Sequence, residues 1–389
     1  MIRFFAEDCA NEKSHHVIIE LQNIKKLLRN SIWHTVVIRR TRKLCRGSFR
    51  VLATSLQCFD RARAKLHVPR RLVLENFSTA TTARLGLSSI RRGKMFTRIL
   101  VPLDESDNAE RALPYARAWA RTLEIPVTLI TVVETAADGF PKKVRDLDTR
   151  IHESMKSSEK YLEKISRTFA GASVQYTVEK GKAEDAIIIN AAADNRTLIT
   201  MASRGRSGVG RWLLGSVAEK VVHGANNAVL VVRANQEMTS EGEAAPESII
   251  VPLDGSNQAE SVLLYIVELA RAFHAKVTLL RAYSLKQIIF SFEQYHPDLD
   301  GLKDALRWEA KTYLDEKVGQ LKSRGLVDVF CCVTEGDAPE TIIEMGKGAP
   351  GTMIVMSPHG GSMIKHWVLG SVTEKVLRHA NNAVLILRT

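Results

Sequence analysis

The chain has 389 residues, of which 45% are hydrophobic and 25% charged, the usual proportions for a soluble globular protein of two or three domains. The formal net charge of +12 is uneven: residues 1–94 carry 20 Lys and Arg against 6 Asp and Glu, and the rest carries 35 against 37. The uneven distribution excludes a positive charge for nucleic-acid binding that is spread over the whole chain. No apolar run approaches the roughly 18 to 20 residues of a membrane span.

Residues 1–94 form a basic segment without a sustained hydrophobic period. One amphipathic helix is predicted around residues 17–28, followed by Arg-rich stretches such as residues 38–43, so we expect a disordered or loosely helical extension. An organellar transit peptide and an arm for nucleic acid or anionic lipid are alternatives. A further hypothesis is that translation starts at Met95, which would make the segment a spurious leader; the intact mass of the native protein decides this.

The five cysteines have no regular spacing, so neither a disulfide framework nor a zinc site is predicted. Cys331 and Cys332 are adjacent in a predicted strand, where they would point to opposite faces as reduced packing residues. This favours a cytoplasmic location. The start of the chain has Glu7 and Asp8 where a secretory signal would have its basic region and apolar core.

From residue 98 the chain alternates strand and helix signals. Residues 99–104 form an apolar run that ends in Pro and Asp, which predicts a central parallel strand entering a loop. A helix capped by Ser106 or Asp107 should follow, because apolar residues from Ala109 to Leu123 make one stripe at helical spacing. Further strands are predicted at residues 127–133, 173–178, 197–201 and 228–232, and further helices at residues 148–169, 183–193 and 211–222.

Residues 234–247 are polar and acidic, which predicts a linker between one domain at residues 95–233 and another at residues 248–389. The second domain repeats the first. Val-Pro-Leu-Asp at residues 101–104 recurs at residues 251–254, and 14 of 20 positions are identical between residues 214–233 and 369–388. Chance does not explain this identity, so the chain contains an internal duplication. Strands of the second domain are predicted at residues 249–254, 277–283, 327–333, 353–356 and 383–387.

The alternation in each domain predicts an α/β fold, a doubly wound parallel sheet of five strands with right-handed crossovers. The ligand crevice of such a sheet lies beyond the carboxyl ends of the strands. Asp104 and Asp254 stand at this edge, where a carboxylate either accepts hydrogen bonds from ribose hydroxyls or caps the next helix. The glycine loop that contains Gly205, Gly208 and Gly210 reaches the same edge, where it either binds phosphate through its amides or is a flexible connection.

The loop carries a pattern that resembles the universal stress protein family. ATP-binding members have Gly, two residues, Gly, nine residues and then Gly-Ser or Gly-Thr, with an Asp after the first strand. The matching residues here are Gly205, Gly215 and Ser216 in the first domain and Gly360, Gly370 and Ser371 in the second. The resemblance covers residues 97–389. It implies a tandem member with two flavodoxin-like domains of the nucleotide-alpha hydrolase type that bind ATP, with or without Mg²⁺.

The resemblance also implies which residues bind the nucleotide. In the first domain they are Pro102, Asp104, Val132, Ala202, Arg204, Gly205, Gly215, Ser216 and Val217. In the second domain they are Pro252, Asp254, Ala282, Ser357, His359, Gly360, Gly370, Ser371 and Val372. Adenine and ribose are expected against Pro102, Asp104 and Val132, and the phosphates against the glycine loop.

The sequence departs from the family pattern at the leading glycine, which is Ala202 in one domain and Ser357 in the other. If the backbone there must take a positive φ, Ala or Ser costs about 1 kcal/mol or more, which predicts a weakened site rather than an abolished one. Arg204, Arg206 and Arg211 accompany the first loop, whereas the second has fewer glycines and less certain charge. The first site is therefore expected to suit polyphosphate better.

No catalytic motif accompanies the loop, since G-x-x-x-x-G-K-[ST], H-E-x-x-H, G-x-S-x-G and paired catalytic carboxylates do not occur. Catalytic and metal-binding residues are therefore not predicted. We expect an ATP-binding module that regulates a stress response. The alternatives are a nucleotide-free interaction or dimerisation protein and a slow ATPase or autophosphorylating enzyme.

The last strand of each domain, at residues 228–232 and 383–387, is apolar and would be a sheet edge in isolation. Such an edge needs cover. The family resemblance implies that the two domains pair through these strands, as single-domain members do when they dimerise. The alternative is cover by a loop of the same domain, and a homodimer of the whole chain is compatible with either arrangement.

Overall fold

The computed structural model describes residues 94–134, 144–204, 214–233, 242–285, 299–347, 349, 351–360 and 369–388. The first half of the fold means the described residues up to 233, and the second half means those from 242 onward. The predictions for residues 1–93, and those for the glycine loop at residues 205–213, lie outside the described residues.

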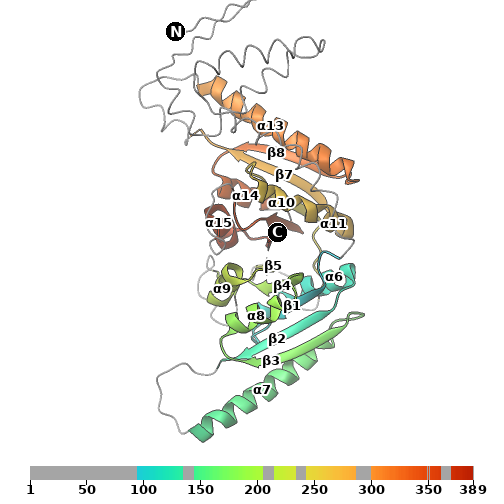
Figure 1. The fold of residues 1–389 in the computed structure, drawn as a ribbon, viewed down its shortest axis with the longest axis vertical. Helices are drawn as coiled ribbons and strands as arrows, with labels where there is room; N and C mark the ends of the chain where they lie inside the picture. Colours follow the sequence, from blue (N-terminus) through green and yellow to red (C-terminus); the bar gives the residue numbers. More distant parts are fainter. Residues whose placement is uncertain are drawn as a thin grey trace, which may run out of the picture. The chain divides into compact units, whose positions relative to one another are not determined.

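The first half follows the predicted order of strands and helices (Figure 1). Its strands are β1 (Arg98–Pro102), β2 (Val127–Val133), β3 (Val174–Lys180), β4 (Thr197–Ala202) and β5 (Ala228–Val232). Its helices are α5 (Asp107–Glu110), α6 (Leu113–Leu123), α7 (Val144–Ser166), α8 (Ala183–Ala192) and α9 (Ser216–Gly224). The second half repeats this order.

The strands of the second half are β6 (Ser248–Pro252), β7 (Lys276–Tyr283), β8 (Val329–Glu335), β9 (Thr352–Met356) and β10 (Ala383–Ile386). The helices are α10 (Asn257–Ser261), α11 (Leu263–Phe273), α13 (Leu299–Ser323), α14 (Ala338–Gly346) and α15 (Ser371–His379).

The helix after β1 differs from the prediction. The expected single stripe is split into α5 and α6, with a turn between them. Pro114 contributes to this break because it has no N–H to donate to the carbonyl of Glu110. The second half breaks at the same place between α10 and α11, with Leu264 in the position of the proline, so proline is not the only cause.

Two predicted boundaries at the carboxyl edge of the sheet are also wrong. β1 ends at Pro102, so Asp104 lies in the loop that follows rather than in the strand. α9 begins at Ser216, and the predicted helical conformation does not extend over Leu214 and Gly215. Gly215 is extended, with φ −65° and ψ 151°, and is the N-cap of α9. This places Gly215 and Ser216 at the helix start instead of inside the helix.

The two halves share one ten-stranded sheet in the order β3-β2-β1-β4-β5-β10-β9-β6-β7-β8. The strands within each half are parallel, and β5 pairs with β10 in antiparallel fashion, with Leu230 opposite Leu385. The predicted pairing through the last strands is therefore confirmed, and the alternative of a covering loop is wrong. In each half the strand order reverses beside the first strand, which creates the crevice expected of a doubly wound sheet.

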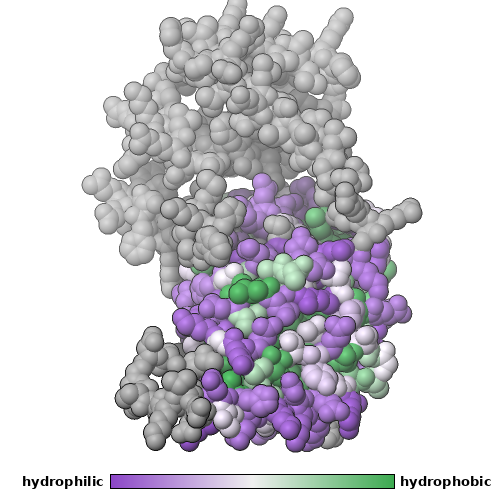
Figure 2. All heavy atoms as spheres, turned by 60° about the horizontal axis from the view of Figure 1, so that its bottom comes forward, coloured by the Kyte–Doolittle hydropathy of each residue, from purple (hydrophilic) through white to green (hydrophobic). Residues whose placement is uncertain are grey.

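Helices cover both faces of the sheet, so the central strands are buried on both sides. Ile99 and Val101 belong to the hydrophobic cluster that contains residues of α6, α7, α11 and α13, whereas Leu100 belongs to the cluster that contains residues of α8, α9, α14 and α15. The first cluster is continuous across the halves, where the rings of Trp119 and Phe273 lie 4.9 Å apart. Hydrophilic residues predominate on the described surface in Figure 2, with hydrophobic residues scattered among them.

Cys331 and Cys332 are free cysteines on β8. Cys331 packs against the cluster that contains α13, and Cys332 against the cluster on the opposite face. The predicted alternation of the two side chains is thus confirmed. Within the described residues, no helix combines the length and hydrophobicity that crossing a bilayer requires.

Candidate functional site

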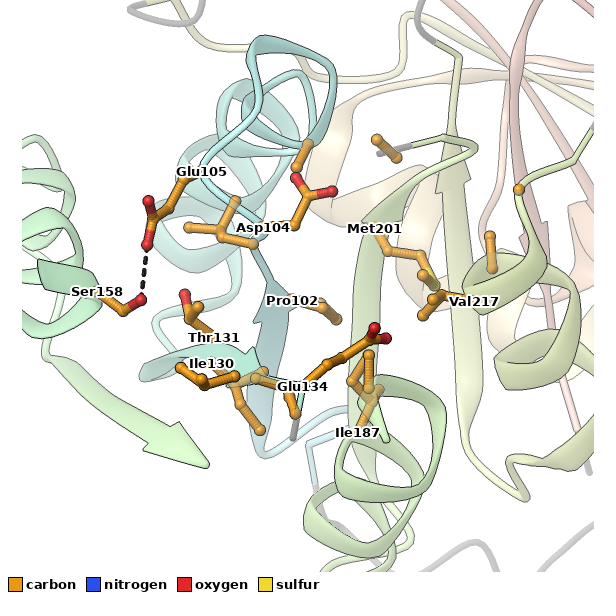
Figure 3. A pocket seen from close by; sticks show the side chains of 18 of the residues that line it. Pro102, Asp104, Glu105, Ile130, Thr131, Glu134, Ser158, Ile187, Met201 and Val217 are labelled. Carbon is orange, nitrogen blue, oxygen red and sulfur yellow. Dashed lines mark hydrogen bonds between the residues drawn. The ribbon is translucent and has the colours of Figure 1, made fainter. Parts of the chain in front are cut away.

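A pocket of about 690 Å³ opens in the first half at the carboxyl ends of β1, β2 and β4 (Figure 3). The strand order reverses here, and the volume lies in the range of small-molecule sites. Eight of the nine residues predicted for this half line the pocket: Pro102, Asp104, Val132, Ala202, Arg204, Gly215, Ser216 and Val217. The ninth, Gly205, lies outside the described residues.

Asp104 organises the loop between β1 and α5. Its Oδ1 accepts hydrogen bonds from the amide of Ser106 at 3.2 Å and from the Ser106 hydroxyl at 2.5 Å. The Ser106 hydroxyl in turn accepts the amide of Ala109 at 3.2 Å and caps α5. Direct capping by Asp104, the alternative reading of its position, is therefore wrong. The carboxylate orients the serine that caps, and it also forms part of the pocket wall.

The N-terminus of α9 forms another wall of the pocket. Its N-cap is Gly215, which has no side chain to accept the first helical amides. The amide of Gly215 donates to the carbonyl of Ser203 at 2.8 Å, so the end of β4 holds the start of α9 in place. A Cβ on Gly215 would lie 3.2 Å from this carbonyl oxygen. Close approach of the two backbones thus accounts for the glycine.

Ala202 does not carry the strain expected from its place in the motif. Among the described non-glycine residues, only Glu105, Glu124 and His274 have a positive φ. Ala202 ends β4 in register with Val232 and is 6% exposed. The replacement of the leading glycine therefore imposes no left-handed backbone here, and the small Ala side chain leaves the pocket open beside it.

The pocket also contains polar residues that sequence reasoning missed. Ser154, Ser157 and Ser158 reach it from α7, and Glu105 accepts a hydrogen bond from Ser158 at 2.6 Å (Figure 3). The spacing i, i+3, i+4 of the serines on one helix face was a usable signal. Thr131 lines the pocket from β2, is 4% exposed and has no hydrogen-bond partner for its hydroxyl among the described residues.

The described charges of the pocket are mixed. Asp104, Glu105 and Glu134 bring three carboxylates, and Arg204 is the one cation among the described lining residues. Arg233, which follows β5, adds positive charge close to Arg204. Burial, together with the charge of Arg204, lowers the pKa of Arg233 to about 10. Positive potential is therefore concentrated at the β4 and β5 side of the pocket.

The second half brings its predicted residues to the equivalent edge. The N-cap of α15 is Gly370, whose amide donates to the carbonyl of Pro358 at 2.8 Å, as Gly215 does to Ser203. Ser357 donates to the carbonyl of His359 at 2.5 Å and, like Ala202, has no positive φ.

The remaining predicted residues of this half lie on the same loops and strands. Pro252 ends β6, Ala282 lies on β7, and Ser371 and Val372 begin α15.

In the second half, the backbone at Gly360 lies close to the carboxylate of Asp254, which follows β6. Its Oδ1 accepts the amide and the hydroxyl of Ser256 at 2.9 and 2.6 Å, which repeats the arrangement at Asp104. A Cβ on Gly360 would collide with Oδ2 of Asp254. A larger residue would require the Asp254 side chain to move, so the backbone at Gly360 packs directly on the carboxylate.

Comparison with known proteins identifies the fold. The model of the universal stress protein family matches residues 95–233 and 246–388. A universal stress protein of Mycobacterium tuberculosis is 26% identical over 192 residues, which are 49% of this chain and 61% of that relative's length. A universal stress protein of Methanocaldococcus jannaschii is 29% identical over 153 residues, 38% of this chain and 88% of the relative.

Two solved structures share the fold over most of the chain. A universal stress protein from Archaeoglobus fulgidus matches with a TM-score of 0.56 at 19% identity, over 75% of this chain and 99% of the other. A putative universal stress protein from Pseudomonas aeruginosa matches with a TM-score of 0.51 at 16% identity, over 76% and 95%. The two family matches coincide with the two halves of the sheet, and the chain belongs to the universal stress protein family as a tandem, two-domain member.

Proposed function

We propose that the first half binds an adenine nucleotide, ATP, in this pocket and that the chain acts as a regulatory module in a stress response. The observation that carries the proposal is the N-terminus of α9, which opens onto the pocket without a capping side chain. The first amides of a helix lack partners within the helix and carry partial positive charge, an environment that phosphate groups prefer. Ser216 adds a hydroxyl, and Arg204 a positive charge, at the same end.

The other walls suit the rest of a nucleotide. Pro102 and Val132 offer apolar surface to the adenine ring, and Asp104 offers a carboxylate that accepts hydrogen bonds from ribose hydroxyls. Apolar surface combined with converging polar groups is typical of small-molecule sites. The Gly-Ser pair at residues 215 and 216 is also part of the motif of ATP-binding family members, which supports the same assignment.

The three carboxylates of the pocket lead us to expect binding of the magnesium complex. Asp104, Glu105 and Glu134 would repel a bare triphosphate, and Mg²⁺ reduces that repulsion. Mg²⁺ is commonly held by substrate phosphates with one or two carboxylates, so a dedicated cage is not needed. In the described part of the chain, no cluster of three or more His, Cys, Asp or Glu side chains is arranged to hold a metal ion. We expect a chelator to weaken ATP binding by about tenfold or more.

Calorimetric titration of the full chain with Mg-ATP tests the proposal. Asp104→Ala should weaken binding by about tenfold or more because the ribose loses its acceptor. Ser106→Ala is the matched control: it removes the cap that Asp104 orients but keeps the carboxylate, so affinity should stay within about twofold. Asp254→Ala should leave binding to the first half unchanged. If the wild-type protein gives no heat of binding and no thermal stabilisation at millimolar ATP, nucleotide binding is rejected.

Phosphate release distinguishes a binding module from a slow ATPase. Bound ATP that stays intact over hours, with no labelled phosphate transferred to the protein, rejects both enzyme alternatives.

We also place the protein in the cytoplasm, where free cysteines persist. Burial and the hydrogen bond with Asp315 raise the pKa of the Cys331 thiol, so little reactive thiolate forms. Cell fractionation tests this location.

A further inference from the structure

The strand that lies beside the first strand carries a threonine in one half and an arginine at the equivalent position in the other. Thr131 of β2 follows Ile130, whose carbonyl accepts the amide of Leu103 at 2.9 Å. Arg281 of β7 follows Leu280, whose carbonyl accepts the corresponding amide after β6 at 2.8 Å. The same backbone bond therefore precedes both residues, and Thr131 and Arg281 are structural equivalents.

Thr131 lines the pocket, and its buried hydroxyl has no partner among the described residues. The residue is 4% exposed, and its hydroxyl makes no hydrogen bond within the described residues. A buried hydroxyl normally has a partner, because burial removes it from water. Since the residue lines the pocket, a ligand there can supply the missing partner. Figure 3 shows Thr131 on the side of the pocket where Glu105 and Ser158 meet.

Arg281 reaches across the corresponding space in the second half. Its guanidinium carbon lies 4.6 Å from the ring centroid of Tyr313 on α13. One guanidinium nitrogen lies 2.9 Å from where a Cβ on Gly255 would be. Gly255 directly follows Asp254, and its counterpart in the first half is Glu105, a pocket residue. The guanidinium thus spans from the loop after β6 to α13, over the region that is pocket in the first half.

Sheet order shows which part of a nucleotide would meet the arginine. β7 lies on one side of β6, and β9, which leads to α15, lies on the other. Phosphates at the N-terminus of α15 would therefore lie away from Arg281. The base is assigned to Val132 on β2 in the first half, and the equivalent Ala282 directly follows Arg281 on β7, so the arginine lies on the base side of the crevice. The guanidinium accordingly competes with the base instead of pairing with the phosphates.

We propose that the residue at this position determines which half takes the nucleotide: the Thr131 hydroxyl hydrogen-bonds the ligand in the first half, and the Arg281 side chain blocks the equivalent space in the second. The inference rests on the proposed nucleotide binding and specifies its stoichiometry, one nucleotide per chain. It also gives the duplicated second half a structural role that does not require a ligand.

Reciprocal substitution in the full chain tests the proposal, with Mg-ATP as the probe and stoichiometry measured by calorimetry and equilibrium dialysis. Wild type should bind one nucleotide, Arg281→Thr two and Thr131→Arg none. The double variant Thr131→Arg/Arg281→Thr should bind one, now in the second half. Thr131→Val, which keeps the shape but removes the hydroxyl, should weaken binding about fivefold, the effect of one hydrogen bond.

Arg307→Thr is the matched control, because Arg307 is an exposed arginine on α13 of the same half and its loss should leave one site unchanged. Thermal melts verify folding, and if Arg281→Thr does not fold, the two Thr131 variants decide the outcome. Two nucleotides on wild type, normal binding by Thr131→Arg, or one nucleotide on folded Arg281→Thr overturns the inference while nucleotide binding stands. Binding to none of the proteins, wild type included, overturns the proposed function itself.

Discussion

Residue 105 shows how a single backbone conformation is used differently in the two halves. Glu105 has a φ of 65°, in the left-handed region, and the equivalent Gly255 has a φ of 89°. The left-handed conformation costs a residue with a Cβ about 1–2 kcal/mol, which glycine avoids. The first half tolerates this cost, and the carboxylate of Glu105 accepts a hydrogen bond from Ser158 there. In the second half, Gly255 has no side chain and leaves room for Arg281.

This comparison predicts the stability of two variants at the same position. Glu105→Gly and Glu105→Ala both lose the hydrogen bond from Ser158, so the difference between them isolates the backbone. We expect the glycine variant to be more stable than the alanine variant by about 1 kcal/mol in urea denaturation. Equal stabilities would show that the backbone at residue 105 carries no such strain.

Asp194 makes stability depend on pH. The hydrogen bond from the Thr97 hydroxyl, at 2.5 Å, and that from the Arg196 amide, at 3.0 Å, lower the pKa of Asp194. Because the folded-state pKa lies below the unfolded value of about 3.9, the carboxylate stabilises the fold above that pH. The stabilisation is lost as pH falls through the folded-state pKa.

Asp194→Asn should therefore be less stable than wild type at pH 6, and the difference should shrink toward pH 3. Urea denaturation at several pH values measures this difference in stability. Thr97→Val removes the hydrogen bond that lowers the pKa of Asp194 most, so it should also reduce the dependence of stability on pH. A difference that stays constant from pH 6 to pH 3 would contradict the assigned role of Asp194.

At the scale of elements, a pair of equivalent asparagines ties helices to strands in both halves. Asn227, just before β5, donates to the carbonyls of Ala191 and Asp194 at 3.1 and 2.8 Å, at the end of α8. Asn382, just before β10, likewise donates to the carbonyls of Gly346 and Thr352 at 3.0 and 3.2 Å. Each amide thus satisfies a carbonyl at the end of a helix and a second one before or at the start of the next strand, in the turn at Asp194 in the first half and at Thr352 of β9 in the second.

Replacing either asparagine should cost about 2 kcal/mol, because two hydrogen bonds are lost at roughly 1 kcal/mol each. Asn227→Ala and Asn382→Ala are therefore expected to shift the urea midpoint by similar amounts. Asn226→Ala is the control, since Asn226 is the exposed neighbour in the same turn and should change stability by less than about 0.5 kcal/mol. An effect in one half alone would contradict the equivalence of the two ties.

At the scale of the molecule, the halves are joined by more than one kind of contact. β5 and β10 pair across the middle of the sheet, and the ring of Trp119 packs against that of Phe273 on one face at an interplanar angle of 47°. Arginines also cross between halves: Arg388 donates to the carbonyl of Val222 at 2.5 Å, and Arg233 donates to a carbonyl near the end of α15. Backbone pairing, apolar packing and helix-end hydrogen bonds therefore act together.

This joint core predicts one cooperative unfolding transition for the two halves. Trp119 is fully buried, so Trp119→Ala should cost about 3–5 kcal/mol and lower the stability of both halves together. Calorimetry and hydrogen exchange, followed on peptides from each half, measure this. Two separate transitions in wild type, or a loss confined to the first half, would contradict a shared core.

The sequence by itself determined the duplication, the alternation of strands and helices, and the residues that gather at the carboxyl ends of the strands in the first half. These features follow from local patterns: apolar runs, helical stripes, the recurrence of Asp104 at residue 254, and the Gly-Ser pairs. Such signals need only neighbouring residues, so they survive without knowledge of distant contacts. The ends of β1 and α9 were misplaced because short-range patterns fix element boundaries poorly.

Only the tertiary structure decided the rest, because each of these features depends on groups from separate elements. The lone hydroxyl of Thr131 and the reach of Arg281 to Tyr313 become visible once strands and helices are assembled. The backbone of Ala202 avoids the left-handed region because β4 holds it in register with β5. The antiparallel pairing of β5 with β10 joins segments far apart in the chain, and packing across both halves selects it over a covering loop.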